Sequence, residues 1–278
     1  MTFVQKIVFR IKNLALVLQG NLSVVAAFLF ALCLATLIYV MYLYGQYATS
    51  PAFSIDPATI SIADLFIGIA PRLTLVGVCF TPLSIFFMLY CVKNDFLSPR
   101  IVRFRRIESF WALQVVKALL AALLFALTLT ITTYVLGLVL GLPAVTFDSL
   151  EGIFFLRTKG FTIPNPPLYY LGFILFSYVF LTLSFVNLIW LLLDAILPKR
   201  WMAIAVSVAL GALSIRIRTI YAFADISYTS WMPIPGTTFG FEYLIPAVVA
   251  AIAAGAIYYR IRGCPRARYI ELENTRDA

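Results

Sequence analysis

Few residues in this chain are of types that do chemistry. Its 278 residues include no histidine, which removes histidine-dependent metal sites, Ser-His-Asp hydrolases and histidine proton relays. Of the four cysteines, Cys33, Cys79 and Cys91 lie in apolar segments, and none, including Cys264, is paired at metal-binding spacing. We therefore expect reduced thiols. No GxxxxGK[ST] motif is present for holding ATP phosphates. The sequence predicts a protein that is not an enzyme and needs no cofactor or metal.

Charged residues inside the apolar segments are the next candidates, because such charges usually mark transport paths. Lys117 and Asp194 lie near the ends of their segments, where they can snorkel towards water, so we favour a structural role. Arg216 and Arg218 fall where a short fifth span should approach the outer face, and they either snorkel or pair with outer carboxylates. No carboxylate is expected at mid-membrane, which argues against a proton- or sodium-coupled carrier.

The strongest local concentration of charge is the stretch "SPRIVRFRRIESFW" at residues 98–111. A serine followed by a proline is a good helix start, and from there apolar residues recur on one side and arginines on another. We predict a short amphipathic helix over 98–108. It is either a topology anchor on lipid phosphates or a helix that docks on a separate protein. The docking interpretation takes in Ser98, Arg100, Ile101, Arg103, Phe104, Arg105, Arg106 and Ile107.

The amino-acid composition predicts the helices that position these residues. The chain is 63% hydrophobic and only 12% charged, with a mean hydropathy of +0.98. We predict an all-α integral membrane protein forming one transmembrane domain over 1–278. A basic amphipathic helix over 3–18 is expected to lie in the membrane interface ahead of the spans. The six expected spans are about 22–44, 73–92, 111–141, 168–193, 201–215 and 243–259.

The distribution of basic residues predicts the orientation. Fifteen fall before the first span, between spans two and three, between spans four and five, and after span six, whereas five fall in the other connections. The richer side is cytoplasmic by the positive-inside rule, so both termini are expected inside. The net charge of +9 thus needs no nucleic acid partner. On the outer side we expect loops over 45–70 and 142–167, and an aromatic segment over 219–242 at the interface.

Small residues recur at four-residue spacing, which permits close helix contact. The sequence leaves open whether they pack the bundle internally or form a subunit interface. They are Gly137 and Gly141; Ala203, Ser207 and Gly211; and Ala247, Ala251 and Gly255.

The whole layout resembles the membrane subunit of a small exporter-type ABC transporter, of the kind linked to bacteriocin or antimicrobial-peptide export and immunity in Gram-positive bacteria. The resemblance is carried by "RIVRFRRIESFWALQVVKAL" at 100–119, a basic helix followed by two aromatics and a long span. It implies a permease in a bacterial cytoplasmic membrane, partnered by a separate ATP-binding subunit and a second membrane subunit. It also implies that residues 98–108 are the coupling helix that docks on the ATPase.

Three rival functions are weighed against this one. A secondary transporter or channel would be favoured by a mid-membrane carboxylate or a polar stripe, and neither is found. An intramembrane protease is disfavoured by the lack of histidine and of a paired-carboxylate motif. A non-transporting immunity or scaffold protein is compatible with the sequence.

Overall fold

The computed structural model describes residues 22–49, 60–69, 79–92, 107–144, 168–197, 199–216 and 241–262. Within these ranges the chain is helical apart from turns and helix ends. The helices are α2 (Leu22–Thr49), α3 (Ile62–Ile69), α4 (Thr81–Val92), α6 (Ile107–Val139), α8 (Leu168–Ile196), α9 (Arg200–Arg216) and α11 (Phe241–Arg262). The all-helical prediction is confirmed for this part of the chain.

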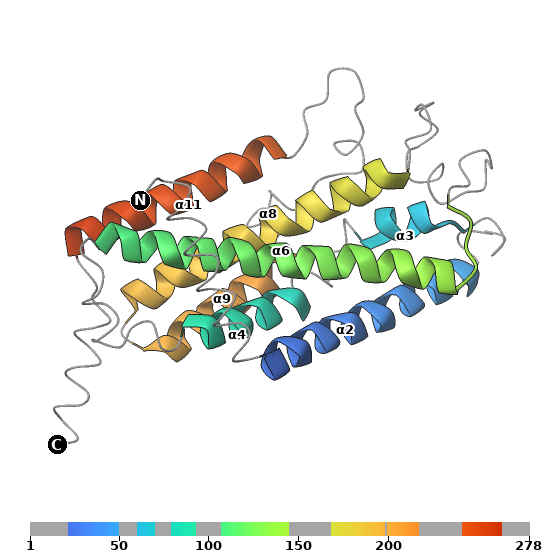
Figure 1. The fold of residues 1–278 in the computed structure, drawn as a ribbon, viewed down its shortest axis with the longest axis horizontal. Helices are drawn as coiled ribbons and strands as arrows, with labels where there is room; N and C mark the ends of the chain where they lie inside the picture. Colours follow the sequence, from blue (N-terminus) through green and yellow to red (C-terminus); the bar gives the residue numbers. More distant parts are fainter. Residues whose placement is uncertain are drawn as a thin grey trace.

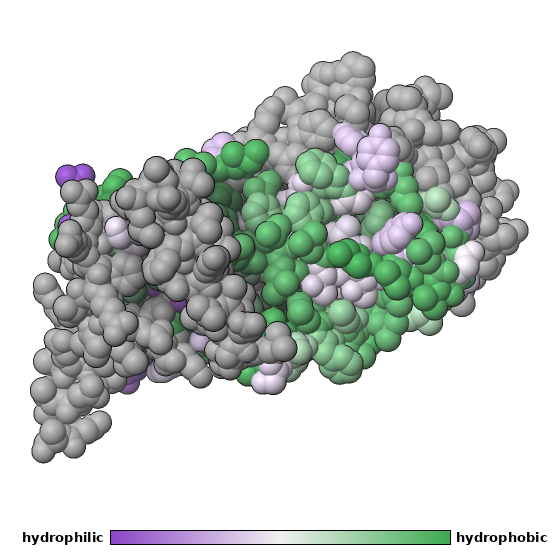
Figure 2. Space-filling view, in the orientation of Figure 1, coloured by the Kyte–Doolittle hydropathy of each residue, from purple (hydrophilic) through white to green (hydrophobic). Residues whose placement is uncertain are grey.

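Three of these helices are long and apolar enough to cross a bilayer: Ser23–Gly45 within α2, Ser109–Val139 within α6, and Leu168–Ile196. Shorter apolar helices occupy Thr81–Val92, Arg200–Ala209 and Ile245–Ile261. Large hydrophobic side chains are exposed along the helices, and Figure 2 shows hydrophobic residues over most of the described part of one face. A surface of this kind suits lipid rather than water, so the chain has the character of a membrane protein.

The long helix α6 shows how the sequence builds the bundle. Its buried side chains recur at alternating spacings of three and four residues, which places them on one face. They include Trp111, Val115, Ala118, Ala122, Phe125 and Leu129. The helix ends in a Schellman motif: Gly141 has a φ of 68°, its N–H bonds to the Leu138 carbonyl, and the Leu142 N–H bonds to that of Gly137.

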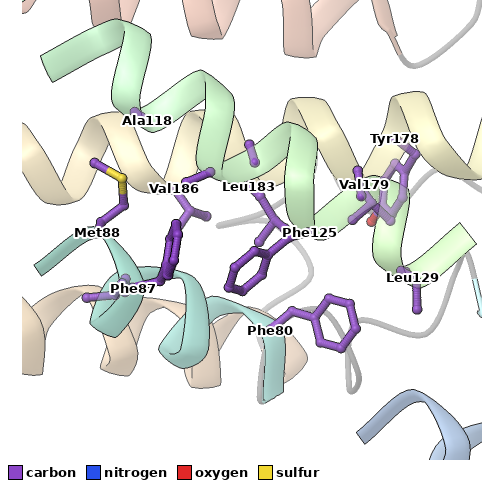
Figure 3. Packing of buried hydrophobic residues seen from close by; sticks show 14 of the residues in the cluster. Phe80, Phe87, Met88, Ala118, Phe125, Leu129, Tyr178, Val179, Leu183 and Val186 are labelled. Atoms are coloured by element: carbon purple, nitrogen blue, oxygen red, sulfur yellow. The ribbon is translucent and has the colours of Figure 1, made fainter. Parts of the chain in front are cut away.

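Helix α8 is the centre of the bundle. It packs against α3, α4, α6, α9 and α11, and most of its residues are buried, whereas most residues of α2 are at least partly exposed. Figure 3 shows side chains from α4, α6 and α8 meeting in the core, with Phe87, Phe125 and Val186 gathered between the three helices. One continuous cluster of buried apolar residues draws on all seven helices. The inner end of the bundle is defined here as the end where α6 begins, and the outer end as the end where α6 finishes.

The contacts between helices give their directions along the bundle. Asn187 of α8 contacts Ala118 of α6, and Gly172 lies by Thr130, so α6 and α8 are antiparallel. Phe87 of α4 contacts Phe125, and Cys91 contacts Lys117, so α4 and α6 are also antiparallel. Tyr258, near the end of α11, contacts Ala195, near the end of α8, so α8 and α11 run in the same direction. Helices α4, α8 and α11 therefore run opposite to α6 in the arrangement that Figure 1 shows.

The structure differs from the sequence prediction in the expected outer loop 45–70. Helix α2 runs on to Thr49, and residues 62–69 form α3. All side chains described between Ile60 and Ile69 are buried. This helix was missed because eight residues are too short to register as a span, and because a serine and an aspartate give the segment the composition of a loop. The other predicted spans each overlap a helix, and the fifth extends through Arg216.

The two alternatives for the small residues are now distinguished for those with described side chains. Gly137 lies against Ile62 of α3, and Gly255 lies against Trp111 of α6. Ala203, Ser207 and Ala251 are buried within the bundle. These residues therefore pack the chain internally. Gly141 is different, since a side chain there would meet nothing within 4 Å, and its role is the helix end described above.

Candidate functional site

The predicted docking stretch lies almost wholly outside the described residues. Ser98, Arg100, Ile101, Arg103, Phe104, Arg105 and Arg106 belong to this undescribed part, and Ile107 is the first residue of α6. The interfacial helix over 3–18 also lies outside, as do most of the outer segments 142–167 and 219–242. The candidate site is therefore built from the inner end of the bundle, where α4 stops and α6 starts.

Lys117 fastens α6 to the end of α4. Its Nζ donates a hydrogen bond to the Cys91 carbonyl oxygen at 2.9 Å. That carbonyl belongs to the last turn of α4, whose final carbonyls have no partner within the helix. A cation at a helix C-terminus also interacts favourably with the helix dipole. The half-buried Lys117 therefore acts as a cap for the neighbouring helix α4.

Asn187 of α8 joins three helices, at a position next to Lys117 but nearer the middle of the bundle. The Ser84 hydroxyl of α4 donates to Asn187 Oδ1 at 2.8 Å, and Asn187 Nδ2 donates to the Ala118 carbonyl oxygen of α6 at 3.3 Å. Ser84, Asn187 and Ala118 are fully buried. An amide carries both a donor and an acceptor, so one side chain serves two neighbouring helices at once. Asn187 was not singled out from the sequence, where a lone asparagine in an apolar run carries no sign of its partners.

Asp194 ties α8 to α9 across the short turn between them. Its Oδ1 accepts a hydrogen bond from Arg200 Nε at 3.4 Å, and the carboxylate side chain has no exposed surface. The expectation that Asp194 snorkels into water is therefore wrong. Arg200, six residues later at the start of α9, lies within reach of this carboxylate. Pairing with the arginine reduces the cost of burying the charge.

Aromatic residues attach α11 to the same end. Trp111 of α6 donates from Nε1 to the Ile252 carbonyl oxygen at 3.0 Å, and its ring stacks on Tyr259 with centroids 5.3 Å apart. The Tyr258 hydroxyl donates to the Ala195 carbonyl oxygen of α8 at 3.1 Å. Both tyrosines come from one turn of α11, so one helix is held to two others.

These contacts define the inner collar, which links α4, α6, α8, α9 and α11 at one end of the bundle. Its members are Ser84, Trp111, Lys117, Asn187, Asp194, Arg200, Tyr258 and Tyr259, with the backbone carbonyls they contact. The collar holds no nucleophile-and-base pair. Among the described residues no three histidine, cysteine or carboxylate side chains are placed to hold a metal. The contacts of the collar join five helices to one another.

A second polar feature lies at the outer end, in α3. Ser61 and Asp64 form a capping box: the Ser61 N–H and hydroxyl both donate to Asp64 Oδ2, at 2.9 and 2.7 Å, and the Asp64 N–H donates to Ser61 Oγ at 3.3 Å. Asp64 is 1% exposed. The spacing S-x-x-D ahead of apolar residues is the signal that could have found this helix from the sequence.

A scan against protein-family models and searches of curated proteins and of solved structures find no match to this chain.

Proposed function

We propose that this chain is the permease subunit of an exporter-type ABC transporter in a bacterial cytoplasmic membrane. In this proposal it crosses the membrane six times with both termini inside, so the inner collar is cytoplasmic. A separate ATPase supplies the energy, and a second membrane subunit, identical or related, completes the pathway. The cargo is a hydrophobic or amphipathic molecule, a peptide or an antibiotic.

The observation that carries the proposal is how the helices on either side of the basic stretch are joined. Residues 93–106 connect the end of α4 to the start of α6. Just inside that connection, Lys117 bonds these two helices to one another, and Asn187 bonds both of them to the central helix α8. A displacement applied to residues 98–106 would therefore reach three helices together.

The rest of the collar extends this linkage. Asp194 and Arg200 join α9 to α8, so α9 would move with α8. Trp111 and Tyr258 join α11 to α6 and α8, so α11 would move with both. Well-packed elements joined in this way transmit displacements as rigid bodies. ATP-driven closure of the ATPase would push on residues 98–108 and tilt the collar as a unit, which is the action required of a permease.

An ion-coupled carrier is the main rival, and the buried carboxylates argue against it. Asp64 and Asp194 are the buried carboxylates among the described side chains. Asp64 is engaged by the cap of its own helix, and Asp194 by Arg200. Each sits at one end of the bundle. A carrier that binds protons or sodium ions requires such groups along its path.

The proposal is tested by reconstituting the chain in liposomes with a candidate ATPase subunit encoded by a neighbouring gene of its own operon. ATP hydrolysis would be measured with and without the permease, for the parent and for the variants Phe104→Ala and Arg103→Ala. We expect Phe104→Ala to abolish the permease-dependent hydrolysis and Arg103→Ala to weaken it less. A buried apolar anchor contributes about 2 kcal/mol or more to an interface, whereas a rim charge contributes less.

Phe86→Ala is the matched control, because Phe86 is a 47% exposed phenylalanine of α4 that faces away from the core. It should leave hydrolysis unchanged. If no ATPase associates with the chain and Phe104→Ala has no effect, the docking role is refuted. The basic stretch is then a topology anchor, and a non-transporting membrane protein becomes the better interpretation.

A further inference from the structure

Four side chains of α8 and α9 carry a buried polar atom that has no hydrogen-bond partner in the part of the chain that the structure describes. They are Thr182, Ser184 and Trp190 of α8 and Ser207 of α9, and each is at most 5% exposed. Buried polar atoms almost always find a partner, so each of these exceptions calls for a physical explanation.

The hydroxyl groups have a solution within their own helices. A helical serine or threonine can donate to the carbonyl four residues earlier. Four threonines of this bundle do so at 2.8–2.9 Å, namely Thr36, Thr128, Thr130 and Thr133. Rotation about one bond would give Thr182 and Ser184 the same partner, so these two hydroxyls need no ligand. The same rotation is open to Ser207, whose importance comes from its position.

The indole N–H of Trp190 has no such solution. An indole nitrogen only donates, and the ring holds it away from the backbone of its own helix. Trp190 is 0% exposed, so bulk water does not reach it. Trp111 is also buried, and its N–H is satisfied by the Ile252 carbonyl oxygen at 3.0 Å. Trp190 has the same requirement, and leaving a buried donor without an acceptor is costly.

Trp190 faces the seam where α4, α8 and α9 meet. It lies four residues before Asp194, which pairs with Arg200 of α9. It lies three residues after Asn187, which bonds to Ser84 of α4. Residues at these spacings share one face of a helix. Helices α4 and α9 also contact each other (Figure 1), so the indole is enclosed between three helices.

Ser207 borders the same seam from the opposite helix. Residues 197–199 are the only connection between α8 and α9, so α9 can pack against α8 only by running back along it. Arg200, Ala203 and Ser207 recur at spacings of three and four residues, which places them on one face. Because Arg200 pairs with Asp194, this face meets α8. Ala203 and Ser207 are both buried, as the placement requires.

The levels of Trp190 and Ser207 along the two helices are close. Measured from the pair of Asp194 and Arg200, Trp190 lies about 6 Å back along α8 and Ser207 about 10.5 Å along α9, an offset of about 4.5 Å. Helical side chains lean towards the N-terminus of their own helix, so in this antiparallel pair the two lean towards each other. The structure has no direct hydrogen bond between them. Two hydrogen bonds in series, through one water oxygen, would join them.

We propose that one ordered water molecule binds in the seam between α4, α8 and α9, where it accepts the Trp190 N–H and donates to Ser207 Oγ. Buried waters make about two to four hydrogen bonds to groups that would otherwise lack partners. The α9 side chains beside the ring, Ala203 and Ser207, are small, which suits a site that must hold a water molecule. The water extends the inner collar by about one turn beyond Asp194 and Arg200. The site is independent of the proposed function.

The test observes water at the indole directly. The full chain, isotopically labelled in its four tryptophans, is held in detergent micelles, and transfer of magnetisation from water to each indole N–H is measured by NMR. Variants with one tryptophan replaced by phenylalanine assign the four signals. Trp111 is the matched control, because it is 2% exposed and its N–H bonds to a carbonyl. We expect a cross-peak with the sign of a long-lived bound water at Trp190 and none at Trp111.

Two outcomes of this measurement would overturn the proposal. Absence of the water cross-peak at Trp190 would refute the site. A strong nuclear Overhauser effect between the Trp190 indole proton and the β-protons of Ser207 would refute the bridge, because the serine and not a water would then be the acceptor.

Melting temperatures give a second, independent readout. Trp190→Phe and Ser207→Ala each remove one side of the bridge. The double variant should therefore lose less than the sum of the two single losses, by about 2–4 °C. Ser184→Ala is the matched control, since Ser184 is an equally buried serine whose hydroxyl has its own helix to bond to, and its effect should add to that of Trp190→Phe. Strict additivity of Ser207→Ala with Trp190→Phe would show that the two groups share no ligand and would refute the bridge.

Discussion

Gly255 is the residue whose replacement tests the packing of the inner collar most directly. A Cβ added to Gly255 would lie 2.0, 2.3 and 2.6 Å from three ring atoms of Trp111. The ring cannot simply turn aside, because it is 2% exposed, its Nε1 bonds to the Ile252 carbonyl, and it stacks on Tyr259. Gly255→Ala must therefore shift α11 or displace the indole.

The expected change in stability combines one stabilising effect and two destabilising effects. Alanine favours a helix over glycine by up to about 1 kcal/mol. Overpacking costs about 1–3 kcal/mol, and loss of the indole hydrogen bond adds about 0.5–1.5 kcal/mol. The clash wins, since the distances to Trp111 are far below van der Waals contact. We expect Gly255→Ala to destabilise the folded chain by about 2 kcal/mol.

The assay is thermal unfolding of the purified chain in detergent, with Gly45→Ala as the matched control. Nothing lies within 4 Å of a Cβ added at Gly45, so this variant should be neutral or slightly stabilised. Trp111→Phe removes the atoms that Gly255→Ala would strike. The double variant should therefore lose less stability than the two single variants together, by at least about 1 kcal/mol. A stable Gly255→Ala, or strict additivity with Trp111→Phe, would refute this account of the contact.

Three further outcomes are expected. Asn187→Leu should lower the melting temperature, because it leaves a buried hydroxyl and a backbone carbonyl without the amide they contact, at a cost of about 1–3 kcal/mol; an unchanged melting temperature would show that the node between helices contributes no stability. Arg200→Ala should destabilise the chain more than Lys199→Ala, since Arg200 pairs with a buried carboxylate whereas Lys199 is exposed; equal effects would count against the pairing. In intact cells, an impermeant thiol reagent should label Thr162→Cys and leave Ala278→Cys unlabelled, and labelling of the latter would overturn the orientation.

The amino-acid sequence by itself determined the helical, apolar character of the chain. Long uncharged runs that lie within a membrane form helices, because in an apolar environment each backbone group must be satisfied within its own segment. The extents of α8 and of the long apolar part of α6 were predicted closely for this reason. The end of α6 is set locally as well, since Gly141 alone supplies the left-handed residue that the turn requires.

Tertiary structure decided the partners of the polar residues and the place of α3. Asp194 is buried because Arg200 lies opposite it on the next helix, and Asn187 bridges positions that lie 69 and 103 residues away in the chain. Helix α3 is buried because two glycines, on α6 and α8, leave room for it. The residues that flank each of these positions in the sequence do not indicate which residues of other helices they contact. Hydropathy is a property of neighbouring residues, whereas burial of a polar or short segment depends on what distant helices offer it.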